Sequence, residues 1–112
     1  MAKYLFQAAY TSEAWAAQLQ NPQNRVEAIR PVIAGLGGRI ESVYFAFGDY
    51  DVIVIIEMPS NVEAAAFSLA VTAGGAIRAI KTTPLMSTAE GVEAMKKAAK
   101  SGYKAPSRSA HA

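Results

Sequence analysis

The sequence predicts an α+β fold of the ferredoxin-like kind: a four-stranded antiparallel sheet in the order βαββαβ, with helices on one face and an additional C-terminal helix. Strand-like and helix-like segments alternate in this order along the 112 residues. Two glycine pairs, Gly37–Gly38 and Gly74–Gly75, follow helical patterns and suit left-handed helix C-caps. We expect one domain over residues 1–100, followed by a flexible basic tail over residues 101–112.

The first strand and helix follow from apolar periodicity. Residues 3–10 alternate as a strand, and residues 13–20 form a short helical turn. The main first helix is predicted to begin at Asn21-Pro22, because Asn favours the N-cap and Pro the first helical position. Pro31 lies inside this helix and is expected to kink or split it, since proline cannot donate the backbone hydrogen bond.

Residues 39–47 and 51–58 predict a β-hairpin, because both are rich in Val, Ile, Tyr and Phe. Glycine at position 48 would suit a two-residue type II′ turn made by Gly48-Asp49. The side packed on the helices would then carry Val43, Phe45, Phe47, Tyr50, Val52, Val54 and Ile56. The opposite side would carry Ile40, Ser42, Tyr44, Ala46, Asp51, Ile53, Ile55 and Glu57.

The second half repeats the pattern of helix, strand and helix. Ser60 and Glu63 predict a capping box at the start of a helix that ends at Gly74-Gly75. Residues 76–83 predict a strand stopped by Pro84. A second capping box at residues 87–90 opens a helix that continues to about Lys100.

The sheet face opposite the helices is unusually apolar. It would expose Ile40, Tyr44, Ile53 and Ile55, more than a monomer normally leaves in water. The same face of a second copy is the simplest cover. The sequence therefore predicts a dimer or larger homo-oligomer, with the sheets packed face to face.

Composition excludes several kinds of site. The chain has no cysteine, which excludes disulfide scaffolds, thiol nucleophiles and Cys-based zinc sites and favours a cytoplasmic location. Its single histidine, His111, lies in the predicted tail, so haem ligation, histidine metal chemistry and a Ser-His-Asp triad lack their required group. We expect no metal and no cofactor.

Charge and hydropathy argue against nucleic-acid and membrane partners. Residues 1–89 hold six basic and seven acidic residues, so the net charge of +2 belongs to the C-terminal segment. A nucleic-acid binder would instead spread Lys and Arg over the face that follows the phosphates. The aromatic strands also lack the basic-Gly-aromatic signature of RNA-recognition sheets. The longest apolar run, residues 52–56, is far too short for a membrane helix.

Several motifs together resemble the GYD-domain family, over about residues 3–90. They are the strand from Tyr4, the helix end at Leu36-Gly37-Gly38, the segment Gly48-Asp49-Tyr50-Asp51, and Ala73-Gly74-Gly75-Ala76 followed by Arg78. Gly48-Asp49-Tyr50-Asp51 matches the Gly-x-Tyr-Asp signature of the family. The resemblance implies a ferredoxin-like subunit of the dimeric α/β-barrel type, in a group of small bacterial and archaeal proteins of largely unassigned function.

Asp51 is the candidate catalytic residue, because it precedes a run of hydrophobic residues and would need a partner if buried. Arg39, Arg78 or backbone amides near the turn could supply that partner. The carboxylate could bind or deprotonate a small polar ligand, or a hydrogen bond to it could simply fix the turn. Gly48 and Asp49 are explained by turn geometry. The candidate ligand-binding set is Tyr10, Arg39, Tyr44, Tyr50, Asp51 and Arg78.

Tyr10, Trp15 and Phe67 could line an apolar pocket between helices and sheet, or simply pack the core. The favoured function is binding of a small organic molecule in that pocket by a homo-oligomer. The alternatives are a cofactor-independent enzyme of the oxygenase or isomerase type, with Asp51 as base or anchor, and a structural or regulatory assembly subunit. The C-terminal helix has one apolar stripe, Val92, Met95 and Ala99, which could dock on the body or on a neighbouring subunit. A solvated, solubilising segment is the alternative.

Overall fold

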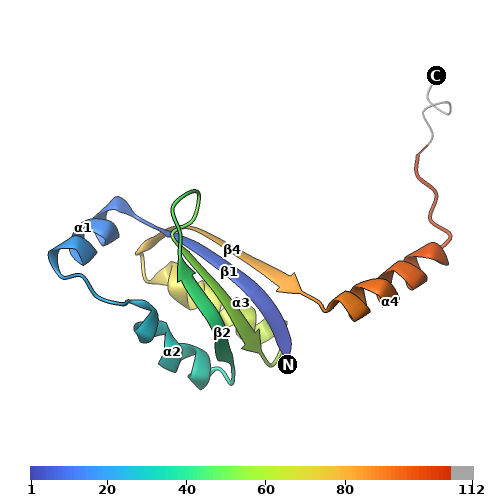
Figure 1. Cartoon of the computed structure of the whole chain (residues 1–112), viewed down its shortest axis with the longest axis horizontal. Coiled ribbons are helices and arrows are strands. Elements are labelled where there is room, and N and C mark those ends of the chain that lie inside the picture. Colours follow the sequence, from blue (N-terminus) through green and yellow to red (C-terminus); the bar gives the residue numbers. More distant parts are fainter. Residues whose placement is uncertain (107–112) are drawn as a thin grey trace.

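Four antiparallel strands form one sheet in the spatial order β2-β3-β1-β4 (Figure 1). The computed structural model describes residues 1–106. The strands are β1 (Ala2–Tyr10), β2 (Arg39–Phe45), β3 (Val52–Met58) and β4 (Ile77–Leu85). Because β1 and β3 are central and pair along most of their lengths, they carry most of the buried side chains.

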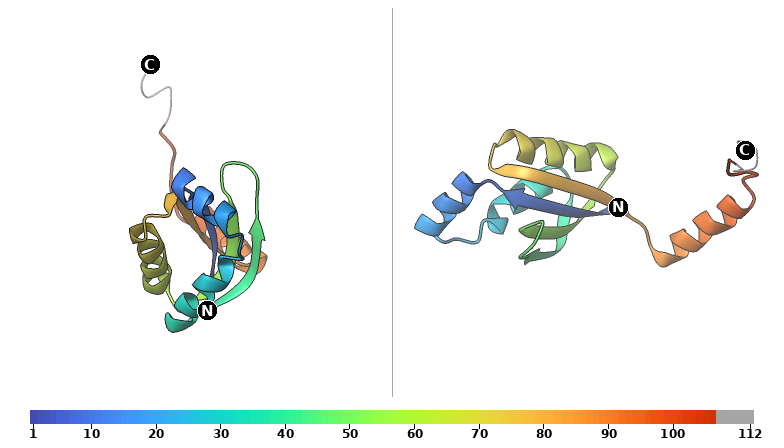
Figure 2. Two further views of the ribbon diagram at one scale, coloured as in Figure 1. Left: turned by 90° about the vertical axis from the view of Figure 1, so that its left-hand side faces the viewer. Right: turned by 90° about the horizontal axis from the view of Figure 1, so that it is seen from above.

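The helices are α1 (Ser12–Gln20), α2 (Val26–Gly35), α3 (Asn61–Ala73) and α4 (Thr88–Ala99). α2 and α3 pack on one face of the sheet, whereas α1 and α4 extend beyond its two ends (Figures 1 and 2). The order of strands, with α2 and α3 as the connecting helices, confirms the predicted ferredoxin-like arrangement.

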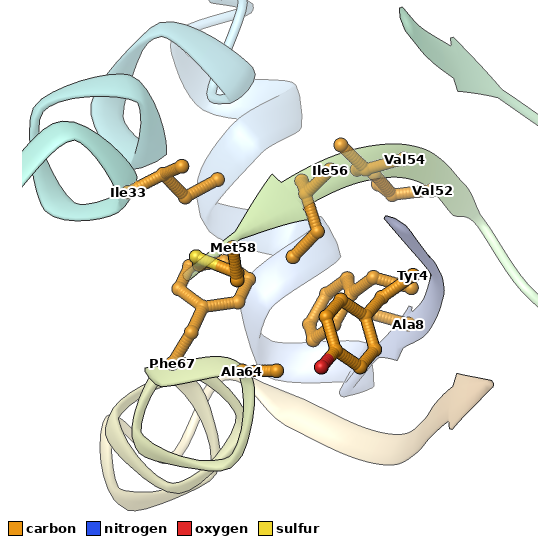
Figure 3. Close-up of a cluster of buried hydrophobic side chains, with 10 residues drawn as sticks. Tyr4, Ala8, Ile33, Val52, Val54, Ile56, Met58, Ala64 and Phe67 are labelled. Atoms are coloured by element: carbon orange, nitrogen blue, oxygen red, sulfur yellow. The ribbon is translucent and has the colours of Figure 1, made fainter. Parts of the chain in front are cut away.

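The core lies between β1, β3 and the two packed helices. β1 and β3 contribute alternate residues, as the two-residue period of a strand requires. Ile33 of α2 and Phe67 of α3 are fully buried against them, and Figure 3 shows both side chains pointing toward Met58. The Phe6 and Phe67 rings contact each other at a centroid distance of 4.8 Å. The buried cluster consists of Tyr4, Phe6, Ala8, Ile33, Val52, Val54, Ile56, Met58, Ala64 and Phe67.

Glycine ends α2 as predicted. Gly37 adopts a φ of 85°, in the left-handed region that terminates helices. The next residue, Gly38, allows a close approach of two chain segments, because a Cβ atom there would overlap the Glu57 carbonyl oxygen and the Met58 sulfur. This pair of glycines therefore both stops the helix and lets the chain enter β2 directly beside the end of β3.

The predicted start of the first long helix is wrong. The chain at residues 21–25 is not helical, and α2 begins at Val26. The N-cap position is Arg25, which has no capping side-chain hydrogen bond, and the Asn24 side chain before it accepts a hydrogen bond from the Val26 amide at 3.1 Å. Pro31 does not split α2, which continues to Gly35. Proline there removes a single hydrogen-bond donor, and the neighbouring Ile33 remains anchored in the core.

The hairpin also differs from the prediction. β2 and β3 are joined by a six-residue loop, residues 46–51, closed by a hydrogen bond of 2.8 Å from the Ala46 amide to the Asp51 carbonyl. Gly48 has a φ of 159°, an extended backbone rather than that of a type II′ turn. Consequently Phe47 and Tyr50 are not strand residues facing the helices, and the Phe47 side chain is fully exposed.

A register shift moves one residue between faces of the sheet. Between Ile40 and Ser42 the pairing of β2 with β3 is irregular, and Ile40 lies opposite Ile56. Ile40 therefore packs against the core. The hairpin prediction placed it on the opposite face of the sheet and is wrong for this residue. Ser42 and Tyr44 keep their predicted side because they pair with Ile55 and Ile53.

β4 does not stop at Pro84, because Pro84 pairs with Tyr4 and the strand continues to Leu85. β4 is an edge strand, where the missing amide donor of proline can face away from the sheet. The capping box of α4 is complete, with reciprocal hydrogen bonds between Ser87 and Glu90. At α3, Ser60 is the predicted N-cap but accepts from the Val62 amide, and its hydroxyl donates to Glu63.

No helix within residues 1–106 is both long enough and apolar enough to cross a membrane. The predicted tail is described only from Ser101 to Pro106, which form no helix or strand. Its remainder, including the basic Arg108 and the histidine at position 111, lies outside the described residues.

Candidate functional site

The Asp51 carboxylate joins three segments at one end of the sheet. Its Oδ2 atom accepts a hydrogen bond from the Tyr10 amide at 2.9 Å and another from Trp15 Nε1 at 3.2 Å. The Asp51 amide in turn donates to the Ala8 carbonyl at 2.9 Å. Asp51 therefore connects the loop before β3 to the last residues of β1 and to α1.

These contacts fix the position of the segment in which β1 ends and α1 begins. The Thr11 side chain caps α1 by accepting from the Ala14 amide, and the Thr11 amide donates to the Ala76 carbonyl beside β4. The Tyr10 and Trp15 rings meet edge to face at a centroid distance of 5.2 Å. Because both donors to Asp51 belong to this segment, the contacts match the structural interpretation of Asp51, a carboxylate that fixes its loop.

A cavity of about 240 Å³ lies between the sheet and helices α2 and α3. Its walls are apolar side chains of β1, α2, β3, α3 and β4, among them Phe6, Val26, Val52, Phe67 and Val71. Tyr10 and Arg25 are the polar or charged side chains that line it. Of the three side chains that the sequence analysis places around a pocket between helices and sheet, Tyr10 and Phe67 line this cavity and Trp15 does not.

Trp15 lines a different hollow. A groove of about 570 Å³ runs between α1 and the loop joining β2 to β3, and we call it the hairpin groove. Most of its wall is apolar or aromatic, and Asp51 lies at its edge with its carboxylate turned to the Trp15 indole. The hairpin groove is lined by Trp15, Gln18, Leu19, Pro22, Gln23, Phe45, Ala46, Phe47, Gly48 and Asp51.

Tyr10 and Arg25 define the polar end of the cavity. Burial raises the pKa of the Tyr10 hydroxyl above its usual 10.0, while the nearby positive charge of Arg25 acts in the opposite direction and lowers that pKa, and Asp51 raises it. The same two side chains also line a second hollow, of about 300 Å³, between α1 and residues 21–25. A phenol and a guanidinium thus lie side by side at the boundary of the apolar cavity.

The other predicted site residues do not join Tyr10 and Asp51. Arg39 lies at the opposite end of the β2–β3 pair, where its guanidinium makes an ion pair and hydrogen bond with Glu57. Tyr44 is exposed on the sheet face away from α2 and α3, Tyr50 is half-buried in the loop, and Arg78 is exposed on edge strand β4.

The partners of Asp51 are thus a backbone amide and an indole, and neither predicted arginine supplies them. Arg39 instead holds the pKa of Glu57 below its usual 4.5, mainly through the hydrogen bond. The sequence offered no periodic signal for Arg25, which lies in the non-helical segment before α2. Its position between a polar Asn-Pro-Gln-Asn run and an apolar helix start is the only local feature that marks it.

Among the described residues, no three His, Cys, Asp or Glu side chains lie close enough together to hold a metal ion. Counting residues 1–106 only, the cavity wall has no carboxylate and the wall of the hairpin groove has one, that of Asp51.

Comparison with known proteins gives one family. The family model of the GYD domain matches residues 4–95 of the chain, which include Tyr10, Arg25, Asp51 and nearly the whole sheet. Among solved structures, the crystal structure of FFRP-DM1 is similar, with 15% sequence identity, coverage of 77% of this chain and 100% of that chain, and a TM-score of 0.48. No curated protein matches the chain.

Proposed function

The chain belongs to the GYD domain family, and we propose that it forms a homo-oligomer that binds a small, largely apolar organic molecule between its sheet and helices α2 and α3. The observation that carries this proposal is the cavity of about 240 Å³ inside the family-matched region. Ligand sites in proteins are concave, mostly apolar and marked by a few polar groups, and this cavity has all three features.

The cavity walls limit the size and character of the ligand. Phe6, Phe67 and the aliphatic side chains around them offer no hydrogen-bonding group, so the buried part of the ligand is apolar. The volume of about 240 Å³ lies below the usual range of about 300–1,000 Å³ for small-molecule sites, which favours a small ligand of about one aromatic ring.

The polar end of the cavity favours a negatively charged or strongly accepting group on the ligand. The Arg25 guanidinium donates only, and the Tyr10 hydroxyl, whose pKa is raised by burial, stays protonated and able to donate at neutral pH. Two donors beside an apolar cavity suit a carboxylate attached to a small hydrocarbon group.

Benzoate, a ring with one carboxylate, is a suitable probe. We expect benzoate to cause saturable chemical-shift changes in amides of α2 and α3 in solution NMR, and benzamide to bind more weakly because it lacks the charge. Arg25→Gln should reduce this preference for benzoate, whereas Arg30→Gln, an exposed arginine of α2 outside the cavity, should leave it unchanged.

Filling the cavity separates specific binding from surface adsorption. Val71→Phe places a ring in the cavity and should abolish the shifts, while Leu69→Phe, on an exposed side of the same helix, should not. Equal shifts in the two variants would locate the binding elsewhere, and the absence of saturable shifts with both probes would overturn the binding proposal.

Self-association is supported by the sheet face that α2 and α3 leave uncovered. Tyr44, Ile53 and Ile55 share this face with Leu5, and the Tyr44 side chain is 66% exposed. We call this surface the open face. Apolar side chains on adjacent strands form the kind of patch that second copies cover in ferredoxin-like sheets with helices on one side only. Native mass spectrometry of the full chain should give a dimer or larger species, and a persistent monomer would overturn this part of the proposal.

A further inference from the structure

Helix α4 stands clear of the rest of the chain. It leaves the end of β4 and points away from the sheet, as both Figures 1 and 2 show. The radius of gyration is 18.7 Å, compared with about 13 Å for a compact domain of roughly this length. An arm of this kind increases the surface of a subunit without adding to its core.

The sequence of α4 nevertheless encodes a well-defined helix with one apolar side. Its N-terminus has a complete capping box, and Lys96 and Lys97 in its last turn suit the helix dipole. Val92 and Met95 lie on one side and are 47% and 69% exposed. Because isolated helices of 12 residues are marginal in water, α4 needs a packing partner for this side, and within residues 1–106 the body of its own subunit lies away from it.

The hairpin groove is the matching unoccupied surface. It lies at the opposite end of the sheet, between α1 and residues 46–51. The Phe47 side chain in its wall is fully exposed, and Leu19 is 74% exposed. Methionine adapts well to aromatic walls, so Met95 suits a groove made by Trp15, Phe45 and Phe47.

The positions of arm and groove fit a two-fold dimer. α4 begins beside the start of β1, where Leu85 pairs with Lys3, whereas the hairpin groove lies where β1 ends. If two open faces stack with their strands antiparallel, each α4 comes beside the α1 and loop of the other copy. Both contacts are then identical, as a two-fold axis requires.

Charge complementarity supports the same pairing. α4 carries Lys96 and Lys97, followed by Lys100, whereas Glu13 lies in the first turn of α1 and Asp49 in the loop that bounds the groove. In the antiparallel dimer these lysines would approach the carboxylates of the other copy, which favours the antiparallel orientation of the two sheets over other orientations.

We propose that α4 is an exchanged arm that packs its Val92 and Met95 side into the hairpin groove of a second copy of this chain. This inference depends on the self-association through the open face proposed above. The exchange would explain why a helix with one apolar side and an apolar groove occur at opposite ends of one subunit, where they cannot meet within it.

Site-specific disulfide formation tests the contact, because the chain contains no cysteine of its own. We expect Met95→Cys mixed with Leu19→Cys under mild oxidation to give a cross-linked heterodimer, seen by mass spectrometry. Met95→Cys mixed with Val62→Cys is the matched control, since Val62 of α3 is as exposed as Leu19, at 73% against 74%, but lies outside the groove. Equal yields in both mixtures, or no cross-link in either, would overturn the exchange.

A second pair of variants tests the energetic importance of the arm. Met95→Glu should raise the dimer dissociation constant at least tenfold, because it puts a charge into an apolar contact. Ala94→Glu adds the same charge to the other side of α4 and should leave the constant within about twofold. An equal effect of both would contradict the packed side inferred here. A wild-type monomer would instead refute self-association itself. A wild-type dimer whose Met95→Cys and Leu19→Cys variants do not cross-link would refute only the arm.

Discussion

Trp15 Nε1 donates a hydrogen bond to the Asp51 carboxylate over 3.2 Å, and this contact links α1 to the loop between β2 and β3 across 36 positions of sequence. The same carboxylate oxygen accepts from the Tyr10 amide. One side chain therefore fixes both the hairpin end and the start of α1, the two elements that form the hairpin groove.

Replacing Asp51 should destabilise the fold. In Asp51→Ala the Tyr10 amide and the indole lose a charged acceptor, and we expect the free energy of unfolding to fall by about 2 kcal/mol. Urea unfolding followed by the fluorescence of the single tryptophan measures this change. Asp49→Ala, in the same loop but exposed, is the control and should stay within about 0.5 kcal/mol of wild type. Equal stability of both variants would contradict the anchoring role of Asp51.

Two glycines near the end of α2 should respond oppositely to alanine. Gly38→Ala forces a methyl group against the Glu57 carbonyl and should cost about 2 kcal/mol. At Gly35, the last residue of α2, an added Cβ atom meets nothing within 4 Å, so Gly35→Ala should gain about 0.5 kcal/mol. Chemical denaturation of both variants checks the prediction, and a tolerated alanine at position 38 would show that the Glu57 backbone can move.

A charge on the open face should separate the subunits. Ile53→Glu places a carboxylate in the proposed interface, and we expect dissociation to monomers at concentrations where wild type associates. Light scattering after size-exclusion chromatography measures the mass. Val62→Glu, at an exposed position of α3, should not change it. If Ile53→Glu keeps the wild-type mass, the subunits associate through another surface.

The ion pair of Arg39 and Glu57 should make the free energy of unfolding depend on pH in the acidic range. Its hydrogen bond lowers the pKa of Glu57 in the folded state below the usual 4.5. The ion pair therefore contributes fully to the free energy of unfolding above about pH 4.5, and this contribution is lost as the pH falls through the lower pKa of the folded state. Glu57→Gln should therefore be less stable than wild type at neutral pH, and the difference should shrink as the pH falls below the usual 4.5 of a glutamate. Urea titrations across this range measure it, and a constant difference would contradict the shift.

Much of the fold follows from local patterns. The alternation of apolar residues located β1, the run of Val and Ile located β3, and the glycines at 37 and 74 marked the ends of α2 and α3, because these signals act within a few residues of sequence. The wrong predictions include the break expected at Pro31, the strand end expected at Pro84, the hairpin loop and the start of α2. The last two depend on contacts outside the local segment: Asp51 contacts the end of β1, and α2 is fixed by the burial of Val26 and Ile33.

The sequence by itself determined the strand and helix order, the placement of Tyr44, Ile53 and Ile55 on one sheet face, and the absence of cysteine chemistry. Only the tertiary structure decided that Arg25 joins Tyr10 at the cavity, that Arg39 pairs with Glu57, and that α4 stands away from the body. Periodicity reports which side of an element is apolar, because that property repeats along the chain. Which side chains meet depends on strand register and loop path, and here a bulge at Glu41 and a six-residue loop set both.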